Sequence, residues 1–179
     1  MLIQTQAVIN IRFLMNRNNK IVLFLVLVIG GLIGLYMYKK YRVAPTIPLL
    51  TQEVFDEQNT KIDLASFKGK PLIISYYASW CGDCIKELKE LNEVKEANLK
   101  GIIIICITDE TKEKLISFKT KRNFPFQFYR INKSFDEIGI HSIPVTYLVN
   151  AKGEMVYNKV GAVQWKDHSF MQYAKKMLE

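Results

Sequence analysis

Cys81 and Cys84 are the residues of this 179-residue sequence whose type and spacing could carry out redox chemistry. They follow an apolar, β-type run at residues 72–77 and precede a stretch with apolar residues at helical spacing (Ile85, Leu88, Leu91 and Val94). The pattern predicts a strand, a turn and a helix that begins at the cysteines. Residues three apart at a helix start share a face with Cα atoms about 5 Å apart, within the range of about 4.4–6.8 Å that a disulfide requires.

The two sulfurs are expected to have different roles because they lie at the start of a helix. A helix N-terminus carries about half a positive charge and free N–H groups, which stabilise a thiolate. Cys81 can then attack a disulfide, and Cys84 lies within reach to resolve the mixed disulfide. A structural disulfide and half of a metal site are the alternatives. The sequence has no second cysteine pair and its two histidines form no ligand motif, so we expect no metal.

The third cysteine, Cys106, lies in the run GIIIICIT at residues 101–108. A continuous β-branched run of this kind predicts a strand buried on both faces. We therefore expect Cys106 to be a buried, inert thiol rather than a reactive partner for the other two.

The net charge of +8 is concentrated at the N-terminal end of the chain. Residues 1–42 contain six basic residues and no acidic residue, whereas residues 43–179 contain 19 basic and 17 acidic residues. No basic stripe with interleaved aromatic residues is apparent in the larger part, so we expect no nucleic-acid partner.

Residues 21–38 form an uncharged apolar run of 18 residues. As a helix this run spans about 27 Å, close to the roughly 30 Å of a bilayer's hydrocarbon core. A core helix would have a polar face and a signal peptide a shorter apolar run, so we expect a transmembrane anchor. Three basic residues on each side leave its orientation open. The expected organisation is a tail (1–20), the anchor (21–38), a proline-containing linker (39–50) and one domain (51–179).

The domain is expected to have an α/β fold, with a mixed sheet flanked by helices. Short strands are predicted at 53–55 and 61–64, longer ones at 72–77 and 101–108, an aromatic strand interrupted by Pro125 at 124–131, and a hairpin at 145–149 and 154–160. Helices are predicted from the cysteines to about residue 97, at 111–122 with Leu115, Ile116 and Phe118 inward, at 134–138 and at 166–178.

Two motifs resemble those of the thioredoxin-like family. Trp80-Cys81-Gly82-Asp83-Cys84, between an apolar strand and a helix, resembles its active site, and Ile143-Pro144 before the hairpin resembles its cis-proline loop. Lys68-Gly69-Lys70-Pro71 and Glu87 make the chain similar to the membrane-anchored branch that includes TlpA and ResA. The resemblance covers residues 51–179. It implies an extracytoplasmic thiol–disulfide oxidoreductase without a cofactor, which reduces disulfides in protein substrates, as in cytochrome c maturation, and is regenerated by a membrane electron donor.

The resemblance also suggests roles for individual residues. By this resemblance, Cys81 is the nucleophile, Cys84 resolves the mixed disulfide with the substrate, and the two cysteines form the redox disulfide. Glu87, three residues after Cys84, is the candidate for proton transfer, although it could instead pair with neighbours on the charged helix face 86–96. Trp80 is expected to shield the motif, with a core position as the alternative. Ile143 is expected to pair with the substrate backbone beside a cis Pro144.

Two residues depart from the family pattern, and one histidine is open to two interpretations. Asp83 occupies a position where the family often has proline, and its charge opposes a Cys81 thiolate that the helix dipole favours. Ser75 lies in the strand where cytoplasmic thioredoxins carry a buried acid, which makes Glu87 the more important carboxylate. His141 could tune the thiolate or simply lie at the surface.

Three other functions compete with disulfide exchange. A copper-binding assembly protein of the Sco type is also anchored and thioredoxin-like, but that family uses C-x-x-x-C with a distant histidine. A non-catalytic thioredoxin-like binding module would use the groove beside the cysteines without exchange. A thiol peroxidase would require P-x-x-x-T-x-x-C, which the sequence lacks.

Overall fold

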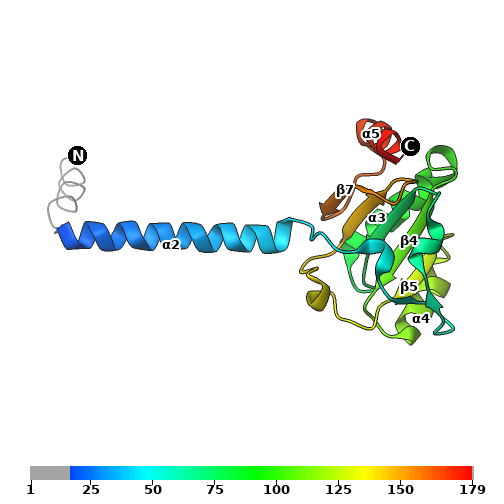
Figure 1. Cartoon of the computed structure of the whole chain (residues 1–179), viewed down its shortest axis with the longest axis horizontal. Helices are drawn as coiled ribbons and strands as arrows, with labels where there is room; N and C mark the ends of the chain where they lie inside the picture. The colour runs from blue at the N-terminus through cyan, green and yellow to red at the C-terminus, as the bar shows by residue number, and fades with distance from the viewer. Residues whose placement is uncertain (1–16, 179) are drawn as a thin grey trace, which may run out of the picture. The chain divides into compact units, whose positions relative to one another are not determined.

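The computed structural model describes residues 17–178. Its first element, α2 (Arg17–Arg42), is one continuous helix (Figure 1). Within it, Asn19–Arg42 is long and apolar enough to cross a membrane, with a mean hydropathy of 2.6 over its most apolar window and none of that window buried. The helix extends past both ends of the expected anchor at 21–38, because residues 17–20 and 39–42 are also helical. Residues 1–16 of the expected tail lie outside the described residues.

The described part of the domain contains a seven-stranded sheet in the order β2-β1-β5-β4-β3-β6-β7. The strands are β1 (Val54–Phe55), β2 (Lys61–Ile62), β3 (Leu72–Tyr76), β4 (Ile103–Thr108), β5 (Gln127–Arg130), β6 (Val145–Val149) and β7 (Met155–Val160). β3 pairs in parallel with β4 and antiparallel with β6. The sheet is therefore mixed, as predicted, with β3 between two long neighbours.

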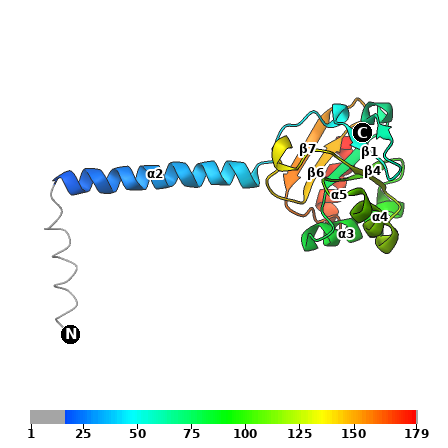
Figure 2. The ribbon, with the colours of Figure 1, turned by 90° about the horizontal axis from the view of Figure 1, so that it is seen from below.

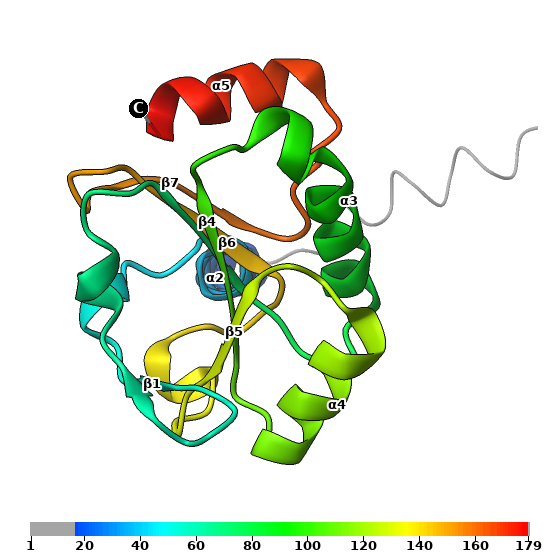
Figure 3. The ribbon, with the colours of Figure 1, turned by 90° about the vertical axis from the view of Figure 1, so that its right-hand side faces the viewer.

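Three helices, α3 (Gly82–Asn98), α4 (Lys112–Arg122) and α5 (His168–Leu178), lie together on one side of the sheet (Figure 3). Side chains of β3 alternate between the two faces, as the two-residue period of a strand requires. Ile73 packs with the three helices, whereas Leu72 and Ile74 pack on the opposite face. That opposite face is covered by residues 44–51, 64–67 and 131–140, which include three short 3-10 helices, η1 (Leu49–Thr51), η2 (Leu64–Phe67) and η3 (Asp136–Ile138).

Residues 39–50, expected as a linker, have two different structures. Residues 39–42 are the last part of α2, and residues after them pack on the domain. Ala44 and Leu49 are buried, and the hydroxyl of Tyr147 donates a hydrogen bond of 2.8 Å to the carbonyl of Pro45. The prolines keep this segment extended, but its apolar side chains belong to the core. Compact structure in the domain accordingly begins at Tyr41.

The predicted helix at 111–122 is present, but the prediction that Ile116 faces inward is wrong. Leu115 and Phe118 are buried, whereas Ile116 is 38% exposed. Leu115 and Phe118 are three residues apart and define the inner face, and Ile116 is rotated about 100° away from Leu115 around the helix axis. The aromatic strand begins at Gln127, two residues after Pro125, because proline has no N–H to donate to the sheet.

Candidate active site at the start of α3

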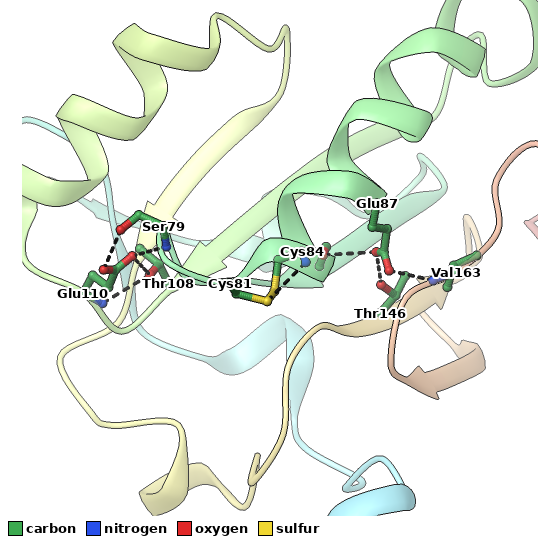
Figure 4. Close-up of a disulfide and its surroundings, with 9 residues drawn as sticks. Ser79, Cys81, Cys84, Glu87, Thr108, Glu110, Thr146 and Val163 are labelled. Atoms are coloured by element: carbon green, nitrogen blue, oxygen red, sulfur yellow. Dashed lines mark hydrogen bonds between the residues drawn. A yellow bond between two sulfur atoms is a disulfide. The ribbon is translucent and has the colours of Figure 1, made fainter.

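Cys81 and Cys84 form a disulfide at the start of α3 (Figure 4). Their Cα atoms are 5.3 Å apart, as predicted from the helical spacing. Cys81 is the N-cap of the helix, and its sulfur accepts a hydrogen bond of 3.1 Å from the Cys84 N–H. This sulfur occupies the position in which Ser or Asp oxygens usually cap helices. The same N–H group and the helix dipole would stabilise a thiolate on Cys81 after reduction.

The two cysteines differ in their access to the surface. Cys81 borders a hollow of about 440 Å³, whereas Cys84 is fully buried and does not line it. Trp80, next to Cys81, is 73% exposed, so the alternative of a core tryptophan is wrong. Of the two sulfurs, that of Cys81 therefore lies where a partner could approach.

The hollow beside Cys81 also contains the loop before β6. Trp80, Cys81 and Ile143 all line it, and the Ile143–Pro144 peptide bond is cis, as predicted. His141 lies on the same hollow, half-buried, with its Nδ1 atom 2.6 Å from Oδ1 of Asp136. The structure thus brings together the cysteine motif and the proline loop, which are about sixty residues apart in the sequence.

Glu87 lies one turn after Cys84 and is buried, so the alternative of surface pairing along the helix is wrong. Its Oε1 accepts hydrogen bonds from the hydroxyls of Thr146 (2.6 Å) and Ser75 (3.4 Å), and its Oε2 accepts one from the Val163 N–H (2.7 Å) (Figure 4). Burial raises the pKa of this carboxyl above its usual 4.5, although the three hydrogen bonds act in the opposite direction. Glu87 is therefore a base of raised pKa on the same helix as the cysteines.

Glu110, which the sequence did not single out, fixes the other end of the active-site turn. Its carboxylate accepts hydrogen bonds from the Ser79 N–H (2.5 Å) and the Ser79 hydroxyl (2.8 Å). The side chain is only 8% exposed, and Lys114 lies 3.4 Å from it. A signal was present, because the C-terminal ends of parallel strands meet at one edge of a sheet, and Ser79 and Glu110 follow β3 and β4.

The remaining cysteine, Cys106, is buried in β4, as predicted. Burial, with a contribution from the Glu87 charge, raises the pKa of its thiol well above the usual value. A thiol in this state is a poor nucleophile. Residues 17–178 contain no cluster of three or more histidine, cysteine, aspartate or glutamate side chains able to hold a metal ion.

The family model described as the AhpC/TSA family matches residues 43–158, which include both cysteines and the cis-proline loop. The chain belongs to the AhpC/TSA family. A thiol-disulfide oxidoreductase ResA of Bacillus thuringiensis is 26% identical over 76% of this chain and 84% of its own length. A thiol:disulfide interchange protein DsbE of Vibrio cholerae is 28% identical over 76% of this chain and 77% of its own length.

The fold also agrees with a solved structure. A thiol:disulfide interchange protein of the thioredoxin family from Chlorobium tepidum superposes with a TM-score of 0.58 over 76% of this chain and 99% of its own, at 20% identity. The chain therefore has a thioredoxin-like fold. With relatives of the ResA and DsbE type and a Cys81–Cys84 pair at the start of a helix, it is a thiol–disulfide oxidoreductase.

Ionisation of Glu87 is expected to reduce the stability of the folded chain. Because burial raises the folded-state pKa, the folded chain binds more protons than the unfolded chain between pH 4.5 and that raised pKa. The free energy of unfolding should therefore fall as pH rises through this window, by about 1.4 kcal/mol for each unit of pKa difference. Glu87→Gln removes the ionisation, so its stability relative to the wild type should increase over the same window.

Urea denaturation of the full chain in detergent, from about pH 4 to about pH 8, measures this difference. Glu96→Gln is the matched control, because Glu96 lies on the same helix with a side chain 81% exposed. The stability difference between Glu96→Gln and the wild type should not depend on pH. If the stability difference between Glu87→Gln and the wild type also did not change with pH, the raised pKa of Glu87 would be contradicted.

Proposed function

We propose that this chain is a membrane-anchored reductase of disulfides in extracytoplasmic proteins, with Cys81 as the attacking thiolate. The observation that carries the proposal is the asymmetry of the pair. Cys81 caps α3 and borders the hollow of about 440 Å³, whereas Cys84 is fully buried behind it. A disulfide bond of a partner can approach the first sulfur and not the second.

The reaction is a two-electron exchange. The Cys81 thiolate attacks one sulfur of the substrate disulfide, a mixed disulfide forms and the other substrate sulfur leaves as a thiolate. Cys84, once deprotonated, attacks the Cys81 sulfur, which releases the second substrate thiol and forms the Cys81–Cys84 disulfide. The substrate gains two electrons and two protons, which a membrane electron donor must return to the pair before the next cycle.

We assign proton transfer from Cys84 to Glu87. The two residues are one turn apart on α3, and the raised pKa of Glu87 brings it closer to that of a thiol. A base is most effective when its pKa lies near the operating pH. The hydrogen bonds from Thr146 and Val163 hold the carboxylate in place, so the transfer does not require reorganisation of the side chain.

We assign substrate binding to the hollow beside Cys81. Trp80 presents an exposed ring, and Ile143, just before the cis Pro144, also lines the hollow. An extended segment of the substrate placed here would run along the backbone of Ile143, a form of strand addition. Its disulfide would then face the sulfur of Cys81.

α2 and the relatives support the location and the substrate class that we propose. A helix able to span a bilayer precedes the domain, and the relatives are named ResA and DsbE. We infer that the domain lies outside the cytoplasmic membrane and that its substrates include proteins of cytochrome c maturation. The two-residue spacing between Cys81 and Cys84 argues against copper binding of the Sco type, and the position of Cys81 on the hollow argues against a binding module without exchange.

The order of attack can be tested with the two cysteine variants. Cys84→Ser should trap mixed disulfides with substrate proteins, because the attacking thiolate remains and the resolving thiol is gone. Cys81→Ser should trap none and should reduce disulfide exchange by at least about a hundredfold, since it removes the nucleophile. Non-reducing electrophoresis after purification measures the adducts, and adducts on Cys81→Ser alone would reverse the assignment.

Glu87→Gln should make the resolving step more dependent on pH. Without a base beside it, Cys84 must lose its proton to hydroxide, so resolution should slow by about tenfold or more at neutral pH and recover as the pH rises. Rapid-quench measurement of the second thiol released from a preformed mixed disulfide gives this rate. Glu96→Gln is again the control, and a wild-type pH profile for Glu87→Gln would exclude it from the step.

The orientation of the anchor can be tested by labelling introduced cysteines. In a background with serine at positions 81 and 84, Gln172→Cys on α5 should react with a membrane-impermeant maleimide on intact cells. Lys20→Cys, at the other end of the apolar run, should react only after lysis. Both side chains are exposed, so access depends on the membrane alone. The reverse pattern would place the domain in the cytoplasm.

A further inference from the structure

The largest excess of positive charge in the domain lies on one helix. α4 contains five basic residues and one acidic residue, whereas the rest of residues 43–179 contains 14 basic and 16 acidic residues. Without α4 the domain would thus carry a small net negative charge. Such a separation makes α4 the part of the domain whose field attracts an anion.

One face of α4 lines a second hollow, of about 350 Å³, which we call the α4 hollow. It is lined by Ser79, Glu113, Lys114, Ser117, Phe118, Lys121 and Arg122. Lys114, Ser117 and Lys121 are spaced by three and four residues and therefore form one stripe along the helix. Three cations and the carboxylate of Glu113 line this space, and the carboxylate of Glu110 lies beside it, 3.4 Å from Lys114, so three cations against two carboxylates leave a positive net charge.

Arg122 is already ordered for binding at this hollow. Its guanidinium carbon lies 5.7 Å from the centre of the Phe118 ring, which holds the side chain in place. Within residues 17–178, its buried Nε atom has no hydrogen-bond partner. Lys114 already lies 3.4 Å from Glu110, and Lys119 lies 2.6 Å from Glu57 and does not line the hollow. A carboxylate that enters the hollow would pair with the positively charged guanidinium of Arg122.

The α4 hollow adjoins the redox site through Ser79. Ser79 lines the α4 hollow and lies two residues before Cys81. It is held by hydrogen bonds to the carboxylate of Glu110, the residue just before Thr111, which caps α4 (Figure 4). A polypeptide whose disulfide meets Cys81 can therefore place neighbouring residues in the α4 hollow. This adjacency favours a peptide occupant over a lipid surface, which would not need to lie beside the cysteines.

We propose that the α4 hollow selects partners whose redox-active cysteines are flanked by acidic residues. The carboxylates of such a partner enter the space between Lys114, Lys121 and Arg122 while its sulfur meets Cys81. The inference rests on the proposed exchange with protein disulfides and adds a charge requirement to it. Contacts of this kind act mainly on the association rate and weaken as salt screens them.

The test compares two synthetic peptides that contain the same disulfide loop, one flanked by glutamates and the other by lysines. The reduced full chain, in phosphatidylcholine nanodiscs, reacts with each peptide in single-turnover experiments. Each rate constant is divided by that for 2-hydroxyethyl disulfide, which is small and uncharged, so that any effect on the cysteines themselves cancels. The wild type should prefer the acidic peptide by about tenfold at low salt, and the preference should shrink at about 0.5 M salt.

Ser117→Glu combined with Lys121→Glu should abolish the preference. The matched control is Lys100→Glu combined with Lys176→Gln, which changes the net charge by the same amount, both on exposed side chains away from the start of α3. Lys100 follows the far end of α3, a helix of 17 residues and thus about 25 Å long. The control should keep the preference.

Four results would overturn the proposal. Equal normalised rates for the two peptides would show that the hollow does not select charge, and equal losses in both double variants would show only an effect of net charge. If the peptides react equally while phosphatidylglycerol nanodiscs protect Lys121 from acetylation, the surface binds lipid instead. Failure of the reduced wild type to react with 2-hydroxyethyl disulfide would refute the proposed function itself, and this inference with it.

Discussion

The constraint on which the site depends is that Cys81 must both end the turn after β3 and cap α3. Its sulfur can accept the Cys84 N–H only if the preceding residues are held in position. Two bonds to the β4 side achieve this, one from the Tyr77 N–H to the Ile107 carbonyl and one from the Ser79 N–H to the Glu110 carboxylate. The parallel pairing of β3 and β4 therefore sets the position of the reactive sulfur before any substrate arrives.

Burial of Glu87 limits how much negative charge the interior of the site must carry. A permanently ionised carboxylate beside a buried thiolate would place two like charges in a medium of low dielectric constant. Since the pKa of Glu87 is raised, a proton that leaves Cys84 moves a negative charge from one group to the other instead of adding a second. The hydrogen bonds from Thr146, Val163 and Ser75 stabilise the ionised form of Glu87 before it accepts the proton.

Periodic patterns in the sequence predicted most of the fold. The continuous apolar runs gave β3 and β4, the hairpin signal gave β6 and β7, and the cysteine spacing gave the start of α3. The surroundings of the cysteines could not be predicted in this way, because their contacts join distant parts of the chain. Thr146 and Val163 are 59 and 76 residues from Glu87, and Ser79 is 31 residues from Glu110. The segment at 43–50 was assigned as a linker because its prolines indicate an extended chain, and an extended chain can also pack.

The two hollows on either side of the active-site turn divide the work of recognition between different forces. The hollow with Trp80 and Ile143 offers a ring and a backbone, which most extended peptides can use. The α4 hollow offers charge, which distinguishes one partner from another and accelerates its arrival. Neither property belongs to the cysteines, whose chemistry is the same for every disulfide that reaches them. A chain with this motif can therefore acquire a new partner through changes on α4 alone, while the turn that holds Cys81 stays as it is.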